Sequence, residues 1–75
     1  MFEQIRRQIQ EAARNGNKIA MFHYQVLSHA RELTNVDANE FCSAVGVPVS
    51  YANEYRKMLS LSRIIQEQGS RLVTN

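Results

Sequence analysis

Apolar residues recur at helical spacing along the first half of the chain, and a turn signal divides them into two stretches. Residues 2–14 are typical of an amphipathic helix, with one apolar stripe formed by Phe2, Ile5, Ile9 and Ala12. The sequence Asn15-Gly16-Asn17 predicts the end of this helix, and Asn17 can cap the next one. The second helix runs to about Thr34, and its apolar line is Ile19, Phe22, Val26, Ala30 and Leu33. We expect this second helix to be the scaffold of the fold.

Residues 37–58 have the pattern of two short helices joined by a glycine turn. Asp37 and Glu40 are predicted to form a reciprocal cap at the start of the first of these helices. Its inward face is expected to hold Phe41 and Val45. Cys42 is a small residue at the position where a larger side chain would hold the second helix off, so we expect it to be buried and inert. A redox role for Cys42 is the less favoured alternative.

The turn between these helices is predicted from three adjacent residues. Gly46 ends the first helix because the chain must enter a left-handed backbone conformation that glycine adopts without steric cost. Val47 can then turn back into the core, and Pro48 suits the entry of a new helix because its fixed φ and missing N–H cost nothing there. Ala52 and Tyr55 should face inward from the second helix, which begins near Val49. This combination predicts a helix-turn-helix, a motif typical of DNA-binding proteins.

The opposite face of the second helix is the candidate base-reading surface. A step of 100° per residue places Ser50, Asn53, Glu54 and Lys57 together on it. In the major groove of DNA, Asn53 could pair with adenine, Lys57 with guanine or phosphate, and Glu54 could accept from cytosine. Ser50 and Tyr51, near the helix start, are expected to contact phosphate.

Several of these assignments have a plainer alternative. Tyr51 could cover the turn instead, and Arg56, which we include among the DNA-contacting residues, could be a solvated partner of Glu54 or of a neighbouring chain. The whole motif could also be an ordinary pair of helices in a bundle.

The segment after the second motif helix carries a separate apolar stripe, formed by Met58, Leu61 and Ile65. In one continuous helix this stripe would point outward, so two alternatives arise: a separate last helix capped at Ser60 or Ser62, or a dimer interface that includes Val49. We favour the break, because serine competes with the backbone inside a helix and suits a cap. Gly69 and Ser70 should close the last helix, and residues 71–75 are either a short strand or a frayed end.

The segment from Val45 to Lys57 resembles the Gly-x-Pro-x-Ser-Tyr-Ala-x-Glu-(aliphatic)-x-Lys motif of a bacterial family of small helix-turn-helix-like domains. This chain departs from the motif at Tyr55, where an aliphatic residue is usual, and at Met58, where a small residue is expected. The resemblance covers about half of the chain and implies a helical stretch before the motif, as in residues 18–35, and a short helix with a β-like tail after it. It implies DNA binding by fold.

The length and composition of the chain limit the number of domains and helices that it can form. Its 75 residues predict one domain, residues 1–75, with an all-α bundle of about four helices. A core this small stabilises by only about 3–5 kcal/mol, so a homodimer is expected. With one cysteine, no charged-then-apolar leader and no long apolar run, we expect a cytoplasmic protein that does not contact a membrane.

The net charge is only +2, yet the basic residues gather at the two ends of the chain around an acidic middle. Residues 1–18 contribute Arg6, Arg7, Arg14 and Lys18 as possible phosphate contacts. Residues 54–75 contribute Arg56, Lys57, Arg63 and Arg71. A phosphate-binding surface therefore requires the two ends to meet in space, and the alternative is a solvated surface of mixed charge.

Enzyme and metal chemistry find little support in the sequence. His23 and His29 are six residues apart, so they do not share a helix face, and with Cys42 they give no zinc-finger spacing. We expect no enzymatic activity, no cofactor and no metal. The predicted function is double-stranded DNA binding by a small transcriptional regulator of bacterial or phage type, and the rival is an adaptor that binds a protein partner through Val49, Met58 and Leu61.

Overall fold

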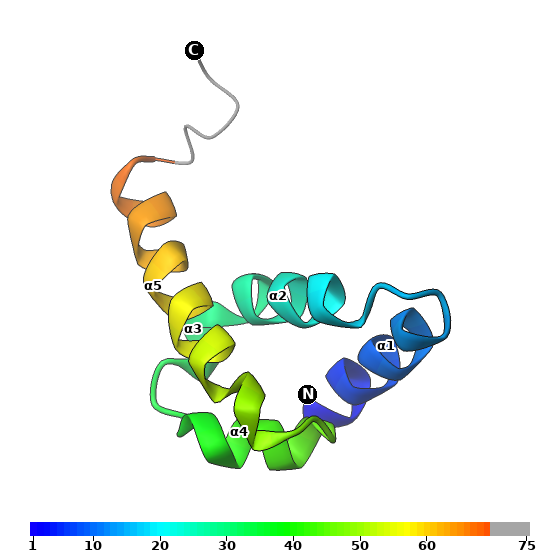
Figure 1. Ribbon diagram of the computed structural model, residues 1–75. Coiled ribbons are helices and arrows are strands. Elements are labelled where there is room, and N and C mark those ends of the chain that lie inside the picture. The colour runs from blue at the N-terminus through cyan, green and yellow to red at the C-terminus, as the bar shows by residue number, and fades with distance from the viewer. Residues whose placement is uncertain (70–75) are drawn as a thin grey trace.

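The N-terminal half of the chain folds into two helices that pack on each other, α1 (Phe2–Arg14) and α2 (Lys18–Ser28). Figure 1 shows them in the computed structural model of the protein, which describes residues 1–69. The amphipathic pattern of α1 is confirmed, because its buried residues are those predicted at Ile5, Ile9 and Ala12. Asn17 precedes α2 as predicted, but its side chain forms no capping hydrogen bond.

The prediction for the second helix is wrong in one respect, because the helix ends where the chain turns at His29 and does not continue to Thr34. The backbone leaves the helical region there, at φ −110° and ψ 20°, and a short helix α3 (Ala30–Leu33) follows. The bend keeps Ala30 and Leu33 buried while redirecting the chain toward the motif. Ile19 is also not a core residue, since it lies in the first turn of α2 and is 42 % exposed.

The first motif helix, α4 (Ala38–Val45), has the predicted cap and the predicted end. The Asp37 carboxylate accepts hydrogen bonds from the backbone N–H groups of Asn39 and Glu40, at 3.0 and 3.2 Å. No return bond from the Glu40 side chain is present among the described residues, so only half of the reciprocal cap forms. At the other end Gly46 has φ +77°, and the next N–H, of Val47, donates to the Cys42 carbonyl at 3.0 Å. This 6→1 bond closes the helix as a Schellman turn and folds Val47 into the core.

The second motif helix begins with a single 3-10 turn, η1 (Val49–Tyr51), and continues without interruption as α5 (Ala52–Glu67). The predicted break at Ser60 or Ser62 is therefore wrong. Ser62 is buried and lines a small notch between α3 and α5, so packing against the bundle outweighs the weak helix preference of serine. The helix ends before Gly69, as predicted, and Gly69 itself has φ +66°. The prediction for residues 71–75 lies outside the described part of the chain.

Five aromatic rings form the centre of the core where α1, α2, α4 and α5 meet. The rings of Phe41 and Tyr55 stack at 4.7 Å between centroids, and Phe22 meets Phe41 and Tyr51 edge-on at 5.8 and 5.0 Å. Phe2 reaches Phe41 from α1 at 5.9 Å. The predicted inward residues of the motif, including small Cys42 at the helix crossing, are all buried.

Tyr55 adds a polar contact that an aliphatic residue could not make. Its hydroxyl lies 2.9 Å from the carbonyl oxygen of Leu33 and 2.8 Å from that of Val36. Burial raises the pKa of this hydroxyl, so it stays protonated and can donate. Tyr55 therefore ties α5 to the segment that leads from α3 into α4.

The architecture agrees with the all-α prediction, since the structure of residues 1–69 consists of five α-helices and one 3-10 turn, without strands. Figure 1 shows α4 and the start of α5 at one side of the α1–α2 pair, and the last turns of α5 extending beyond the other helices. No described helix is both long enough and apolar enough to cross a lipid bilayer.

Candidate nucleic-acid interface

The predicted reading residues lie on η1 and the first two turns of α5, on the side away from the core. Ser50, Asn53 and Lys57 are exposed, as the helical spacing predicts. Glu54 is different, because its side chain is only 31 % exposed and turns toward α2. The reading face therefore presents an amide, a hydroxyl and an ammonium group to solvent, with its carboxylate at one edge.

Glu54 is held by two partners, one of them 31 residues away in the sequence. Nε2 of His23, on α2, lies 2.8 Å from one carboxylate oxygen, and Nζ of Lys57 lies 3.3 Å from the other. The hydrogen bond to His23, and next the one to Lys57, lower the pKa of the Glu54 carboxyl. Glu54 is consequently ionised at neutral pH and is already engaged by two groups of the protein itself.

Arg56 and Asn53 form a second contact along the same helix. Nη1 of Arg56 donates to the side-chain oxygen of Asn53 at 3.0 Å, so Arg56 pairs with Asn53 instead of with Glu54. Both side chains are exposed. Solvated contacts of this kind hold side chains weakly, which leaves the Asn53 amide able to exchange this partner for another.

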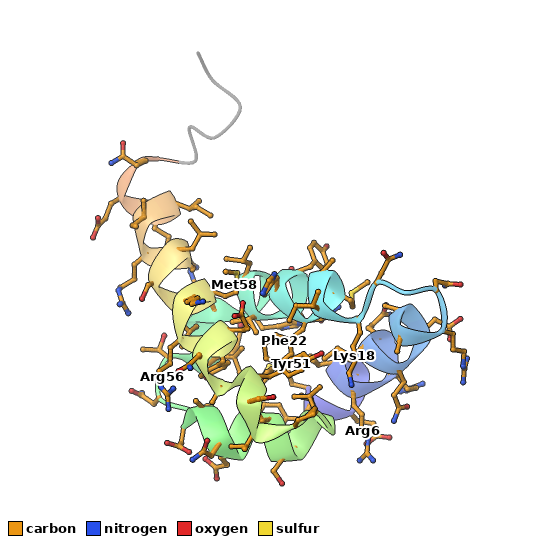
Figure 2. All side chains as sticks on the ribbon, viewed as in Figure 1. Arg6, Lys18, Phe22, Tyr51, Arg56 and Met58 are labelled. Atoms are coloured by element: carbon orange, nitrogen blue, oxygen red, sulfur yellow. The ribbon has the colours of Figure 1, made fainter. Side chains whose placement is uncertain are left out.

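Two basic residues from the N-terminal half lie beside the motif turn. The guanidinium of Arg6 lies over Gly46, with Nε 3.4 Å from where a β-carbon on that glycine would sit. Nζ of Lys18 lies 5.4 Å from the centroid of the Tyr51 ring. Figure 2 shows both on one side of the motif, with Arg56 on the other. The start of the second motif helix is therefore flanked by positive charge on two sides.

The other two basic residues predicted as phosphate contacts lie elsewhere. Arg7 and Arg14 line a polar groove between α1 and α2 together with Tyr24 and His29. Arg14 also pairs with Glu11 at 3.1 Å in an exposed contact. Of the four N-terminal candidates, the fold thus brings Arg6 and Lys18 to the motif and leaves Arg7 and Arg14 apart from it.

Tyr51 and Cys42 both have structural roles. The ring of Tyr51 is half-buried and packs edge-on against Phe22 of α2. Cys42 is buried, and desolvation raises the pKa of its thiol, which keeps it in the unreactive protonated form. Within residues 1–69 no group of three or more His, Cys, Asp and Glu side chains is placed to hold a metal ion.

Apolar side chains also reach the surface of the second motif helix. Val49 is 64 % exposed and Ile64 is 53 % exposed. The predicted stripe of Met58, Leu61 and Ile65 is half-buried along its length, and Met58 packs partly against the core where α5 crosses α2 (Figure 2). The stripe therefore points neither fully inward nor fully outward.

His23 is the residue that sequence reasoning missed. Its contact with Glu54 depends on how α2 and α5 cross. No local pattern links two residues 31 positions apart, so the signal was not present in the spacing of either helix.

No curated protein and no solved structure matches the chain. A family model described as an HTH-like domain does match it, over residues 1–68, which includes every described helix. This match agrees with the capped helix, the glycine turn and the crossing second helix found in the structure. The chain therefore belongs to the family of helix-turn-helix-like domains.

Proposed function

We propose that the protein binds double-stranded DNA and acts as a small transcriptional regulator, with the helix that begins near Val49 entering the major groove. The observation that carries this proposal is the exposed polar face of Ser50, Asn53 and Lys57, flanked at its start by Arg6 and Lys18. A recognition helix presents such a face to base edges, while basic side chains nearby hold the sugar-phosphate backbone.

Base readout falls chiefly to Asn53 and Lys57 in this proposal. Asn53 is exposed, and within residues 1–69 its amide oxygen accepts only from the exposed side chain of Arg56, so its amide is available to pair with adenine. Lys57 can reach guanine or phosphate. Glu54 would accept from cytosine only after exchanging one of its two protein partners, which makes it the least available of the predicted readers.

Phosphate binding falls to residues on both sides of the motif. Ser50 lies at the start of the second motif helix, where backbone N–H groups favour an anion, and Arg6 and Lys18 lie close to that end. Arg56 serves the opposite side. Arg7 and Arg14 are the weaker candidates, since they line the groove between α1 and α2.

Two substitutions on the reading face test the proposal against one matched control. Lys57→Ala should weaken binding to every duplex and reduce the slope of log affinity against log salt by about 0.9 if Lys57 contacts phosphate. Asn53→Ala should weaken binding mainly to a selected target site, by about 1–3 kcal/mol. Arg63→Ala removes a basic residue of the same helix that lines the notch beside α3, and it should have little effect. Equal losses in all three variants would contradict the proposed interface.

A protein-binding adaptor is the second candidate, and the observation that favours it is the apolar surface of the second motif helix, where Val49 is exposed and Met58 and Leu61 are half-buried. In that case a partner helix would dock on Val49, Met58 and Leu61. Leu61→Ala would then break a protein complex, while Lys57→Ala and Asn53→Ala would leave DNA affinity unchanged.

We further propose that the regulator works as a cytoplasmic homodimer without enzymatic activity. The stripe of Met58, Leu61 and Ile65 is a candidate interface, because it leaves apolar surface on a helix that extends beyond the bundle. A two-fold dimer would bind two half-sites about one helical turn of DNA apart. Its mass in solution, measured with and without Leu61→Ala, tests this point.

A further inference from the structure

We propose that His23 is a proton-linked positioning residue for DNA binding: it holds Glu54 at the edge of the reading face and strengthens the complex when it takes up a proton. This inference rests on the proposed function, since it concerns the same surface. His23 itself lies on α2, outside the motif, and is not expected to touch a base.

The geometry defines which imidazole nitrogen of His23 carries the proton. Nε2 of His23 lies 2.8 Å from an oxygen of Glu54, and an ionised carboxylate can only accept hydrogen bonds. Nε2 must therefore carry a proton and donate it. In neutral histidine the other nitrogen, Nδ1, is then unprotonated, and it forms no hydrogen bond with any residue that the structure describes. It is the atom available for a second proton.

The second proton changes the charge beside the reading face. With neutral His23, the cluster of His23, Glu54 and Lys57 has no net charge, because the carboxylate offsets the ammonium group. With protonated His23 the same cluster carries one positive charge. A phosphate backbone nearby favours the protonated form, so binding and proton uptake strengthen each other.

The surroundings of His23 allow this change. Its side chain is 32 % exposed, and within residues 1–69 its one ion-pair partner is Glu54, which in turn contacts Lys57. On the same helix Lys18 lies over Tyr51 of η1 instead of over the imidazole. Phe22 is the neighbouring ring, at 6.4 Å between centroids, and it carries no charge.

The positioning role follows from the same contacts. The His23 imidazole, on α2, donates to one carboxylate oxygen of Glu54, and the other oxygen accepts from Lys57. The imidazole therefore orients the side chain of Glu54 and, through it, that of Lys57. Without this donor, Glu54 is freer to swing toward solvent, where a carboxylate repels phosphate.

The test measures the affinity for a labelled random duplex between about pH 5 and pH 8 at fixed salt. Four proteins are compared: wild type, His23→Gln, His23→Ala and His29→Gln. Wild type should bind more tightly as pH falls, by up to about eightfold at 0.1 M salt, which is the effect of one additional released counterion. His23→Gln keeps an N–H donor but cannot gain a proton, so its affinity should not rise in this way. His29→Gln, the matched control, removes the other histidine, which lines the groove between α1 and α2, and should retain the wild-type pH dependence.

A conservative and a truncating variant separate positioning from charge. At pH 8, His23→Gln should bind more tightly than His23→Ala by about two- to fivefold, the size of effect typical of an exposed polar pair. Equal affinities of these two variants would remove the positioning role.

Three further outcomes would overturn the inference. Wild-type affinity that does not change with pH, or His23→Gln that keeps the wild-type dependence, contradicts proton linkage while leaving DNA binding intact. Absence of duplex binding at every pH instead contradicts the proposed function and the inference together. An NMR titration of the His23 ring supplies a direct reading, since adding duplex should move its midpoint to higher pH.

Discussion

Replacing Tyr55 with phenylalanine isolates the contact that joins α5 to the chain entering α4. The substitution removes one hydroxyl and leaves the ring, which stacks on Phe41 at 4.7 Å and is 1 % exposed. The change in stability therefore reports the hydroxyl and not a cavity. Two carbonyl oxygens lie within hydrogen-bond distance of it, those of Leu33 and Val36.

The expected loss of stability depends on whether each carbonyl oxygen keeps another hydrogen-bond donor. The Leu33 oxygen also accepts the Val36 N–H at 3.0 Å, so it keeps a partner, whereas the Val36 oxygen loses the 2.8 Å bond from the hydroxyl. One lost hydrogen bond with a half-buried acceptor left behind should lower the free energy of unfolding by about 1–2 kcal/mol. For a domain of this size each kcal/mol moves the melting temperature by about 4–8 °C.

Urea unfolding followed by circular dichroism measures this difference, and Tyr24→Phe is the matched control. Tyr24 is 61 % exposed, so loss of its hydroxyl should change the stability by less than about 0.5 kcal/mol. If both variants unfolded at the same urea concentration as wild type, the hydroxyl would not be holding the two segments together and the reasoning would be refuted.

Three other substitutions test separate parts of the account. Cys42→Leu should destabilise by about 1–3 kcal/mol through overpacking at the α4–α5 crossing, and thermal unfolding at the wild-type temperature would show that the helices do not meet there. Gly46→Ala places a β-carbon on a residue with φ +77° and should lower the free energy of unfolding, measured in urea, by about 1–2 kcal/mol. The cost comes mainly from the strained backbone conformation, because the Arg6 side chain above Gly46 can move aside. Because the folded-state pKa of Glu54 is lowered, its contribution to stability is present above the ordinary glutamate pKa of about 4.3 and is lost as pH falls through the lower folded value. Glu54→Gln should flatten the acid side of the stability profile, and an unchanged profile would contradict the bond to His23.

The motif could be predicted from sequence because its constraints are local. A cap at Asp37, a left-handed position at Gly46 and inward Val47 each follow from the backbone of one turn, and all three are found as expected. Family membership over residues 1–68 agrees with this part of the prediction.

The features that were predicted wrongly or missed depend on packing between distant segments. The turn at His29 and the continuity of α5 through Ser62 depend on tertiary packing, since Leu33 of α3 and Ser62 of α5 are both buried, and local preference alone gave the opposite expectation. The partnership of His23 with Glu54 is likewise set by the crossing of α2 and α5. Arg6 and Arg7 are adjacent in sequence, yet only Arg6 reaches the motif turn, because successive residues on a helix point about 100° apart.

In the proposed function, the polar face of the second motif helix and the basic residues around it bind duplex DNA. Fluorescence anisotropy of a labelled random duplex, titrated with the protein at several salt concentrations, tests it most directly. If Lys57, Arg56, Arg6 and Lys18 each neutralise one phosphate, the slope of log affinity against log salt should be about −3.6, and affinity should fall about 150-fold between about 50 and 200 mM salt. Absence of binding at the lowest salt concentration would contradict the claim and direct the search to a protein partner for α5.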